Sequence, residues 1–581
     1  MKGLLGRFEV VRTDILVVGG GLAGCMAAIK ATPGDKRKVV LVDKGHVGKS
    51  GSSVFAAGVL NICTSEDDAD LWLKEIVVRG EYLNDQEWVK TLLEETFPLA
   101  MEMESWGTKT IGKPLMRRDR EGKLLRLRGR GMKFNKVCMV NALDMMEAMA
   151  KTAKDVGVGV INRMMITDVL VDRGRIIGAV GLDYRNNKIV FFLSKAVIMA
   201  ASGCGFKSFF IGHKNLTGEA HKTAYDHGVV LRHFDHANSN LTAKSADLCG
   251  LNLMIGLGGR FINGKGQEFL HQYDPQLGNF ALMPTLALSF CLESEAGRGP
   301  IFLDLSRISA ENRTVIRDLL PEAMAVLETT GIRPFSDPIE YIPAFFGSIV
   351  QGGGIHIDTS CASSLPGLFA VGDSSCNPMQ GTASVGGLNL AFAIVSGARA
   401  ARSSGDYIQS TLSPDIDSDG EDALFAAVER IKAPLKKGTG AFPDEVLRRI
   451  QNVMLRGDTA FLVDEKSLKK GLHELDGIKE MMGEIRATDG HELVKALEVR
   501  SMATIGEIIL RSKLFRQESR GFLYRRDFPF TNNKDWLKWV TVKKEGSTGE
   551  MILSASEFPT PYLRPSEEMY PRFPVKGFEQ E

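Results

Sequence analysis

Cysteine is scarce in this chain of 581 residues, and it is never clustered. The eight cysteines, at positions 25, 63, 138, 204, 249, 291, 361 and 376, form no Cys-x-x-Cys pair. This distribution fits neither a disulfide framework nor an iron–sulfur or zinc site. We therefore expect reduced, buried thiols and no metal site.

The chain also lacks an excess of charge of either sign, because its 72 Lys and Arg residues nearly balance its 71 Asp and Glu residues. A nucleic-acid-binding protein usually needs a basic face, so nucleic acid is not expected as the main partner. No stretch of about 18 uncharged apolar residues occurs, which argues against a membrane span. The first residues have no long apolar segment, so we expect no signal peptide and a cytoplasmic location.

Glycine, in contrast, is abundant. The chain holds 61 glycines, about a tenth of its residues, against a usual ~7 %. Glycine serves where backbone approaches a ligand closely or adopts positive φ. This excess predicts a large cofactor.

The clearest motif lies within residues 14–43. A short apolar strand, the glycine-rich turn 19–24, a helix and a second apolar strand follow one another. Gly19 permits a tight turn, Gly21 lets backbone N–H groups reach a pyrophosphate, and Gly24 lets the helix pack on the strand. The second strand ends in Asp43, which is placed to bind an adenosine ribose. The pattern predicts a dinucleotide-binding βαβ unit.

The rest of the chain alternates between regular and irregular segments. Periodicity predicts helices in 65–110, a basic hairpin in 115–131, a helix in 137–156, a polar linker in 403–420 and a helical region in 420–515, whereas 516–581 is too irregular to assign.

Nine ordered segments resemble the fumarate reductase/succinate dehydrogenase flavoprotein superfamily, which includes L-aspartate oxidase and the adenylylsulfate reductase flavoprotein. The likeness covers nearly the whole chain, at 17–31, 49–58, 201–205, 217–228, 259–270, 295–305, 367–373, 384–401 and 516–537. It implies an α/β fold: a Rossmann-like FAD-binding domain with an inserted α+β capping domain and a C-terminal helical domain. The expected parts are an FAD-binding domain in 1–245 and 346–405, a capping domain in 246–345, a helical domain in 420–515 and a C-terminal tail in 516–581.

The resemblance also implies which residues bind FAD. They are Gly19, Gly21, Leu22, Ala23, Gly24, Asp43, Lys44, Ser50, Gly51, Ser52, Gly58, Ala201, Ser202, Gly203, Gly218, Glu219, Gly372, Asp373, Ser384, Gly386, Gly387 and Leu388. In fumarate reductase complexes, a His attached covalently to FAD occupies the position of Gly51. We therefore expect non-covalent FAD.

The substrate pocket departs from the fumarate enzymes. Their dicarboxylate-binding positions correspond here to the segment His236-Ala-Asn238, to Leu257, to Ile349 and to Ser384. Loss of one cationic partner of a buried carboxylate costs roughly 2–5 kcal/mol. The resemblance therefore implies a substrate other than fumarate or succinate.

Two catalytic candidates remain, Arg298 and His236. Arg298 matches the arginine that delivers a proton in fumarate reductases, but without its companions it serves equally well as an anchor of the capping domain. Seven of the ten histidines fall between positions 213 and 356. His236 is the candidate for polarising the substrate.

The basic hairpin has two interpretations. Its cations, Arg117, Arg118, Arg120, Lys123, Arg126, Arg128 and Arg130, form either a solvated face or a docking face for an acidic, ferredoxin-like electron-transfer protein.

Three functions compete. The leading hypothesis is an FAD-dependent oxidoreductase that acts on a small-molecule substrate as a flavoprotein subunit, with an iron–sulfur partner. The alternative is an electron-transfer flavoprotein subunit of a larger redox complex, with a vestigial substrate pocket. An oxidase like L-aspartate oxidase is weaker, since it needs the same carboxylate-binding residues. The substrate, direction of electron flow, partner and oligomeric state stay open.

Overall fold

A five-stranded parallel sheet forms the centre of the molecule, with the order β18-β11-β2-β3-β7. The computed structural model describes residues 8–32, 37–129, 131–208, 210, 212–246, 250–349, 352–383, 385–414 and 418–576. The central strands are buried apolar runs, as expected for a sheet covered on both faces. They are β2 (Ile15–Val18), β3 (Val39–Asp43), β7 (Gly159–Asn162), β11 (Ala196–Met199) and β18 (Leu368–Ala370).

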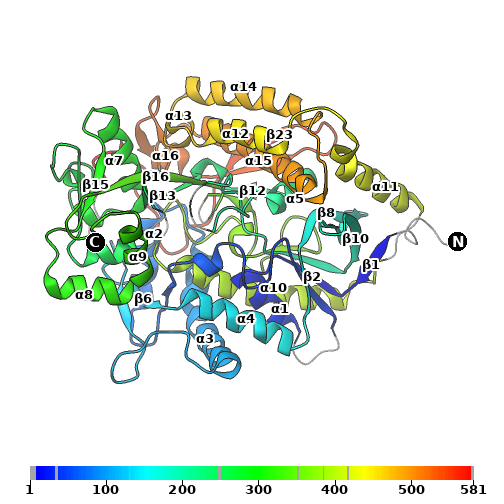
Figure 1. The fold of residues 1–581 in the computed structure, drawn as a ribbon, viewed down its shortest axis with the longest axis horizontal. Coiled ribbons are helices and arrows are strands. Elements are labelled where there is room, and N and C mark those ends of the chain that lie inside the picture. Colours follow the sequence, from blue (N-terminus) through cyan, green and yellow to red (C-terminus); the bar gives the residue numbers. More distant parts are fainter. Residues whose placement is uncertain are drawn as a thin grey trace.

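Helices α1 (Leu22–Ala31) and α10 (Leu388–Gln409) pack tightly against each other beside this sheet (Figure 1). They approach each other closely at Gly397, where a Cβ would lie 2.6 Å from the Ala23 carbonyl oxygen. A second sheet, β1-β10-β9-β8, is built from β1 (Glu9–Arg12), β8 (Met164–Asp172), β9 (Arg175–Asp183) and β10 (Lys188–Leu193). The predicted βαβ unit is present as β2, α1 and β3, with β2 and β3 paired in parallel.

A separate antiparallel sheet, β13-β16-β15-β14, forms the capping domain. Its strands are β13 (Asn238–Ala243), β14 (Arg260–Ile262), β15 (Ile301–Asp304) and β16 (Ile339–Gly347), covered by α7 (Met283–Glu295), α8 (Ala310–Leu319) and α9 (Pro321–Thr329). The domain has its own apolar core, in which the Phe261 ring lies 4.9 Å from Phe290 and 5.8 Å from Tyr341. The predicted fold class is confirmed.

The basic hairpin belongs to a three-stranded sheet, β4-β6-β5, made by β4 (Val59–Asn61), β5 (Arg126–Arg128) and β6 (Lys136–Met139). The predicted helix 137–156 is wrong at its start, because β6 pairs with both neighbouring strands. Helix α4 (Ala142–Asp155) begins only after Asn141, whose side chain accepts a hydrogen bond from the Asp144 N–H. The helices predicted in 65–110 are confirmed as α2 (Ala69–Arg79) and α3 (Gln86–Ile111).

The helical region contains α11 (Ser418–Lys432), α12 (Pro443–Met454), α14 (Glu465–Met482) and α15 (Gly490–Phe515), which lie together along one side of the molecule (Figure 1). The predicted linker 403–420 is too long, because α10 continues to Gln409 and α11 begins at Ser418. None of the helices in the described ranges has the length and apolar character needed to cross a bilayer.

The segment after α15 returns to the N-terminal half of the chain. Its strands β22 (Trp539–Lys544) and β23 (Met551–Ser556) join β12 (Leu231–Arg232) and β17 (Gly354–Ile355) in the sheet β17-β12-β22-β23. Arg516, Glu518 and Arg520 have fully buried side chains. Arg516 donates to Asp235, and Arg520 donates to the Glu81 carbonyl at 2.9 Å. The tail is therefore held by ionic contacts inside the fold.

Candidate functional site

A cavity of about 1540 Å³ lies where the carboxyl ends of the parallel strands face the capping domain. Crevices at this edge of a parallel sheet are the usual ligand sites of doubly wound folds. Residues from the first βαβ unit, the 200–202 segment, α10, the basic hairpin and the capping domain all line this single cavity. Its walls therefore come from widely separated parts of the chain.

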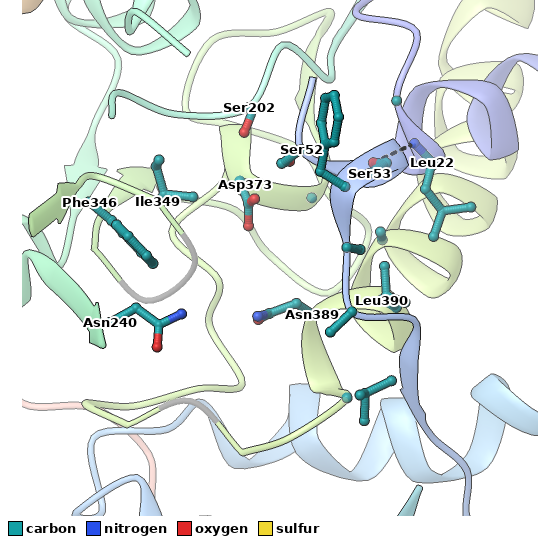
Figure 2. Close-up of a pocket in the computed structure, with 18 of the residues that line it drawn as sticks. Leu22, Ser52, Ser53, Ser202, Asn240, Phe346, Ile349, Asp373, Asn389 and Leu390 are labelled. Atoms are coloured by element: carbon teal, nitrogen blue, oxygen red, sulfur yellow. Dashed lines mark hydrogen bonds between the residues drawn. The ribbon is translucent and has the colours of Figure 1, made fainter. Parts of the chain in front are cut away.

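The glycines of the glycine-rich turn have two different roles: some allow close packing, and Gly21 faces the cavity. A Cβ on Gly24 would lie 1.8 Å from the Gly19 carbonyl oxygen, so that position admits no side chain. Gly21 lines the cavity, and a Cβ there would meet only Ser53 Oγ, at 3.1 Å. The same hydroxyl accepts a hydrogen bond from the Leu22 N–H at the start of α1 (Figure 2). The open space beside Gly21 and the helix N-terminus suits a phosphate.

Asp43 lines the cavity at the end of β3. Its Oδ2 accepts from the Gly20 N–H at 2.7 Å, and its Oδ1 accepts from the Gly45 N–H at 2.6 Å and from Ser50 Oγ at 3.2 Å. A carboxylate has about four acceptor positions. Asp43 is therefore fixed by its neighbours and still has capacity for a ligand hydroxyl.

Lys44 connects this part of the cavity with the helical region. Its Nζ donates to Thr217 Oγ1 at 2.7 Å, to Glu219 at 3.1 Å and to Glu498 of α15 at 2.8 Å. Burial alone would lower the pKa of Lys44, but the two carboxylates outweigh burial and raise it. Lys44 therefore stays charged. Lys44 and Glu219 both line the cavity, and Lys44 connects this part of the wall to Glu498 of α15.

The structure brings together most of the residues predicted to bind FAD. Those that line the cavity are Gly19, Gly21, Leu22, Ala23, Asp43, Lys44, Ser50, Gly51, Ser52, Gly58, Ala201, Ser202, Glu219, Gly372, Asp373, Gly386 and Gly387. Gly24, Gly203, Gly218 and Leu388 do not line it; Gly24 and Gly203 make close backbone contacts, Gly218 precedes α5 (Glu219–Asp226), and Leu388 is buried at the start of α10. Ser384 lies outside the described residues.

The N-terminus of α10 points at the cavity. Gly386 and Gly387 line it, and a Cβ on Gly386 would meet nothing within 4 Å. The Gly387 carbonyl accepts from the Asn61 N–H at 3.2 Å, which connects this helix end to β4. The positive end of a helix favours negative charge beside it.

The two catalytic candidates do not line the cavity. His236 is fully buried beside Asp235, with its Nε2 3.2 Å from the Asp235 carboxylate. Burial, together with the charges of Arg516 and Arg520, lowers the pKa of His236 well below its usual value. Arg298 donates to Glu293 at 2.8 Å and 2.6 Å. Both candidates therefore stay predictions; Arg298 is held by Glu293, whereas neither ring nitrogen of the buried His236 has a hydrogen-bond partner among the described residues.

The histidine that does line the cavity is His213, which the sequence did not single out. It is the only histidine among the described lining residues. Its ring lies 4.5 Å from the Phe346 ring and 5.0 Å from the Phe210 ring, and burial lowers its pKa to about 4. His213 therefore presents a neutral imidazole at neutral pH. Only its place among the clustered histidines marks it in the sequence.

The region below Asp373 is lined by amides and apolar groups rather than by cations. Figure 2 shows Asn240 and Asn389 extending toward each other from opposite sides, with Phe346 and Ile349 nearby. Asn389 Oδ1 accepts from Gln380 at 2.5 Å, and Asn240 Oδ1 accepts from the Leu241 N–H at 2.8 Å. Both amides are therefore oriented by the protein.

Comparison with known proteins agrees with this geometry. The family described as FAD binding domain matches residues 14–390, and the family described as fumarate reductase flavoprotein C-term matches residues 448–570. The matches define a flavoprotein oxidoreductase. More particularly, the chain belongs to the fumarate reductase/succinate dehydrogenase flavoprotein family, as its sequence predicted.

Relatives cover nearly the whole chain. A fumarate reductase (CoM/CoB) subunit of Methanothermobacter marburgensis is 26 % identical over 92 % of this chain and 98 % of its own length. The fumarate reductase flavoprotein subunit of Mycobacterium tuberculosis is also 26 % identical, over 96 % of this chain and 99 % of its own length. The fold matches a variant of Escherichia coli quinol fumarate reductase FrdA with a TM-score of 0.87, at 22 % identity over 96 % and 99 % of the chains. The fold also matches adenylylsulfate reductase from Archaeoglobus fulgidus with a TM-score of 0.80, at 22 % identity over 95 % of this chain and 97 % of that chain.

The cofactor of this family is FAD, and the cavity fits it. Open space lies beside Gly21 and Gly386, Asp43 retains acceptor capacity, and α1 and α10 both direct N-termini toward the cavity. These features are suited to the pyrophosphate, the ribose and the electron-rich edge of a flavin.

Proposed function

We propose that the chain is the flavoprotein subunit of an oxidoreductase that acts on a small organic substrate other than fumarate or succinate, and that it exchanges electrons with an iron–sulfur partner. One observation carries the substrate part of the proposal. Asn238, Leu257 and Ile349, which replace dicarboxylate-binding residues by resemblance, all line the cavity. None of them carries a positive charge.

Bound FAD would supply two-electron redox chemistry, as in other flavoproteins. The chain's own groups position the substrate. The amides of Asn240 and Asn389 donate or accept hydrogen bonds without charge, which suits a carbonyl, an amide or a hydroxyl. Phe346 and Ile349 exclude water beside them. The neutral imidazole of His213 adds one further hydrogen-bonding group.

A panel of enoates tests this proposal. The holoprotein is reduced with viologen, and the return of the oxidised flavin spectrum is followed after rapid mixing. We expect fumarate to reoxidise the flavin slowly and at least one uncharged or monoanionic enoate to reoxidise it rapidly. Rapid reoxidation by fumarate would overturn the proposed substrate class.

The second candidate is an electron-transfer protein with a vestigial pocket. It is favoured by the place of Arg298, which does not line the cavity and is held by Glu293. In that case no enoate reoxidises the flavin, whereas an oxidised iron–sulfur protein does. The same rapid-mixing experiment therefore distinguishes the two functions.

We further propose that FAD is bound without a covalent link. Gly51 lines the cavity and offers no side-chain atom for attachment. Precipitation of the holoprotein with trichloroacetic acid is expected to leave a yellow supernatant and a colourless pellet. A pellet that keeps flavin fluorescence after washing would contradict non-covalent binding.

A further inference from the structure

The cavity extends beyond the N-terminus of α10 to the basic hairpin. Four cationic residues line this end: Arg79, Arg117, Arg128 and Lys133. We call them the mouth cations. Arg117, Arg128 and Lys133 are exposed, while Arg79 lies at the end of α2. The hairpin is thus part of the wall of the cavity.

Three other hairpin cations have carboxylate partners. Arg118 pairs with Glu104, Arg126 with Asp67 and Glu66, and Lys123 with Glu121 at 3.6 Å. Arg117 and Arg128, in contrast, form no ion pair with any described residue. The paired cations are absent from the cavity lining. Two hairpin cations without an ion pair, Arg117 and Arg128, thus line the cavity, whereas Arg120 does not.

Glu75 is the carboxylate that the described lining contributes at this end, and the protein already uses it. It accepts hydrogen bonds from the N–H groups of Lys133 at 2.5 Å, Phe134 at 3.0 Å and Asn135 at 2.9 Å. The Asn135 side-chain amide also donates to Glu75, at 2.9 Å, so four donors occupy most of its acceptor positions. Glu75 therefore fixes the loop that carries Lys133, and it leaves the mouth with net positive charge.

Apolar groups line the cavity next to the mouth cations, in the hairpin and in the part of the capping domain that contacts it. Leu127 and Met132 of the hairpin and Leu277, Phe280 and Leu282 of the capping domain line this stretch. The two sides meet at Gly131, where a Cβ would lie 3.0 Å from the Phe280 carbonyl oxygen and 3.1 Å from Leu282 Cδ2.

We infer that the substrate is an amphiphilic anion. Its charged group, a carboxylate, sulfonate or phosphate, is held by Arg117 and Arg128 at the mouth, and its apolar segment lies against Leu277 and Phe280. Its reacting carbon then reaches the end of α10. This inference rests on the proposed function and names the substrate class of the same site.

Binding of two inert probes tests the inference without catalysis. Octanoate and octanamide share an apolar chain and differ in charge, and their affinity for the holoprotein is measured by calorimetry. Hydrogen bonds to charged groups contribute about 1.5–3 kcal/mol. The double variant Arg117→Gln/Arg128→Gln is therefore expected to weaken octanoate binding about tenfold or more and to leave octanamide binding unchanged.

The matched control is Arg120→Gln/Lys123→Gln, which removes the same charge from residues of the hairpin that do not line the cavity. It is expected to bind both probes as the wild type does. In the wild type, added salt is expected to weaken octanoate binding only, because exposed charges are screened. This measurement remains available if the double variant does not fold.

Equal loss of octanoate binding in both double variants, or octanoate binding that is insensitive to salt, would overturn the inference. So would a double variant that binds octanoate normally while its flavin is reduced more slowly by a reduced ferredoxin, because the hairpin would then be a protein-docking face. None of these outcomes depends on whether an enoate reoxidises the flavin.

Discussion

Gly21→Val is expected to yield a folded protein that retains much less FAD than the wild type. The backbone at Gly21 has φ −76° and ψ −171°, an extended conformation that valine adopts without strain. A Cβ there would meet only Ser53 Oγ, at 3.1 Å, so a shift of that hydroxyl by a few tenths of an ångström lets the apo fold accommodate it. The two further methyl groups enter the space suited to the pyrophosphate. Overpacking of this kind costs roughly 1–3 kcal/mol, which weakens binding about fivefold to more than 100-fold.

The ratio of flavin absorbance to protein absorbance after gel filtration measures this loss, and the far-ultraviolet circular dichroism spectrum reports the fold. Gly477→Val is the matched control. Gly477 is exposed on α14, and a Cβ there meets nothing within 4 Å. Full flavin content in Gly21→Val would show that the turn does not hold the pyrophosphate.

Glu518→Gln is expected to destabilise the protein more than any surface substitution. Glu518 Oε1 accepts from Arg516 at 2.6 Å and from Arg520 at 2.8 Å, and Oε2 accepts from Arg520 at 2.9 Å. All three side chains are fully buried. Removing one partner of a buried ionic group leaves uncompensated charge and costs roughly 3–5 kcal/mol.

Urea denaturation of the holoprotein measures this change. Glu445→Gln removes an exposed carboxylate that pairs with Arg449 within one helix, and such pairs contribute about 0.3–0.5 kcal/mol. A Glu518→Gln variant with the same urea midpoint as Glu445→Gln would contradict a stabilising role for the buried network.

The sequence predicted those parts of the fold that local patterns determine. The βαβ unit depends on apolar strands and on glycines that allow a close turn, so residues such as Gly24 were recognisable before the structure. The two helices in 65–110 follow from apolar periodicity. In these segments, neighbouring residues along the chain carry most of the information.

Features set by pairing between distant segments were not predicted. Lys136–Met139 forms a strand because β4 and β5 lie on either side of it. The tail is ordered because it joins β12 and buries Arg516, contacts that no local pattern reveals. His213 and the mouth cations reach the cavity in the same way, through folding of remote segments onto one another.

The buried network around Arg516 also has a consequence for biosynthesis. The partner of Asp235, Arg516, lies 281 residues further along the chain. Arg520 donates to the carbonyl of Glu81, which lies 439 residues before it. At roughly 5–20 residues per second, a ribosome needs about 14–56 s to make the first of these intervals. During that time the buried carboxylate of Asp235 lacks its cation. The N-terminal portion of the nascent chain therefore reaches its final form only after the last segment emerges from the ribosome.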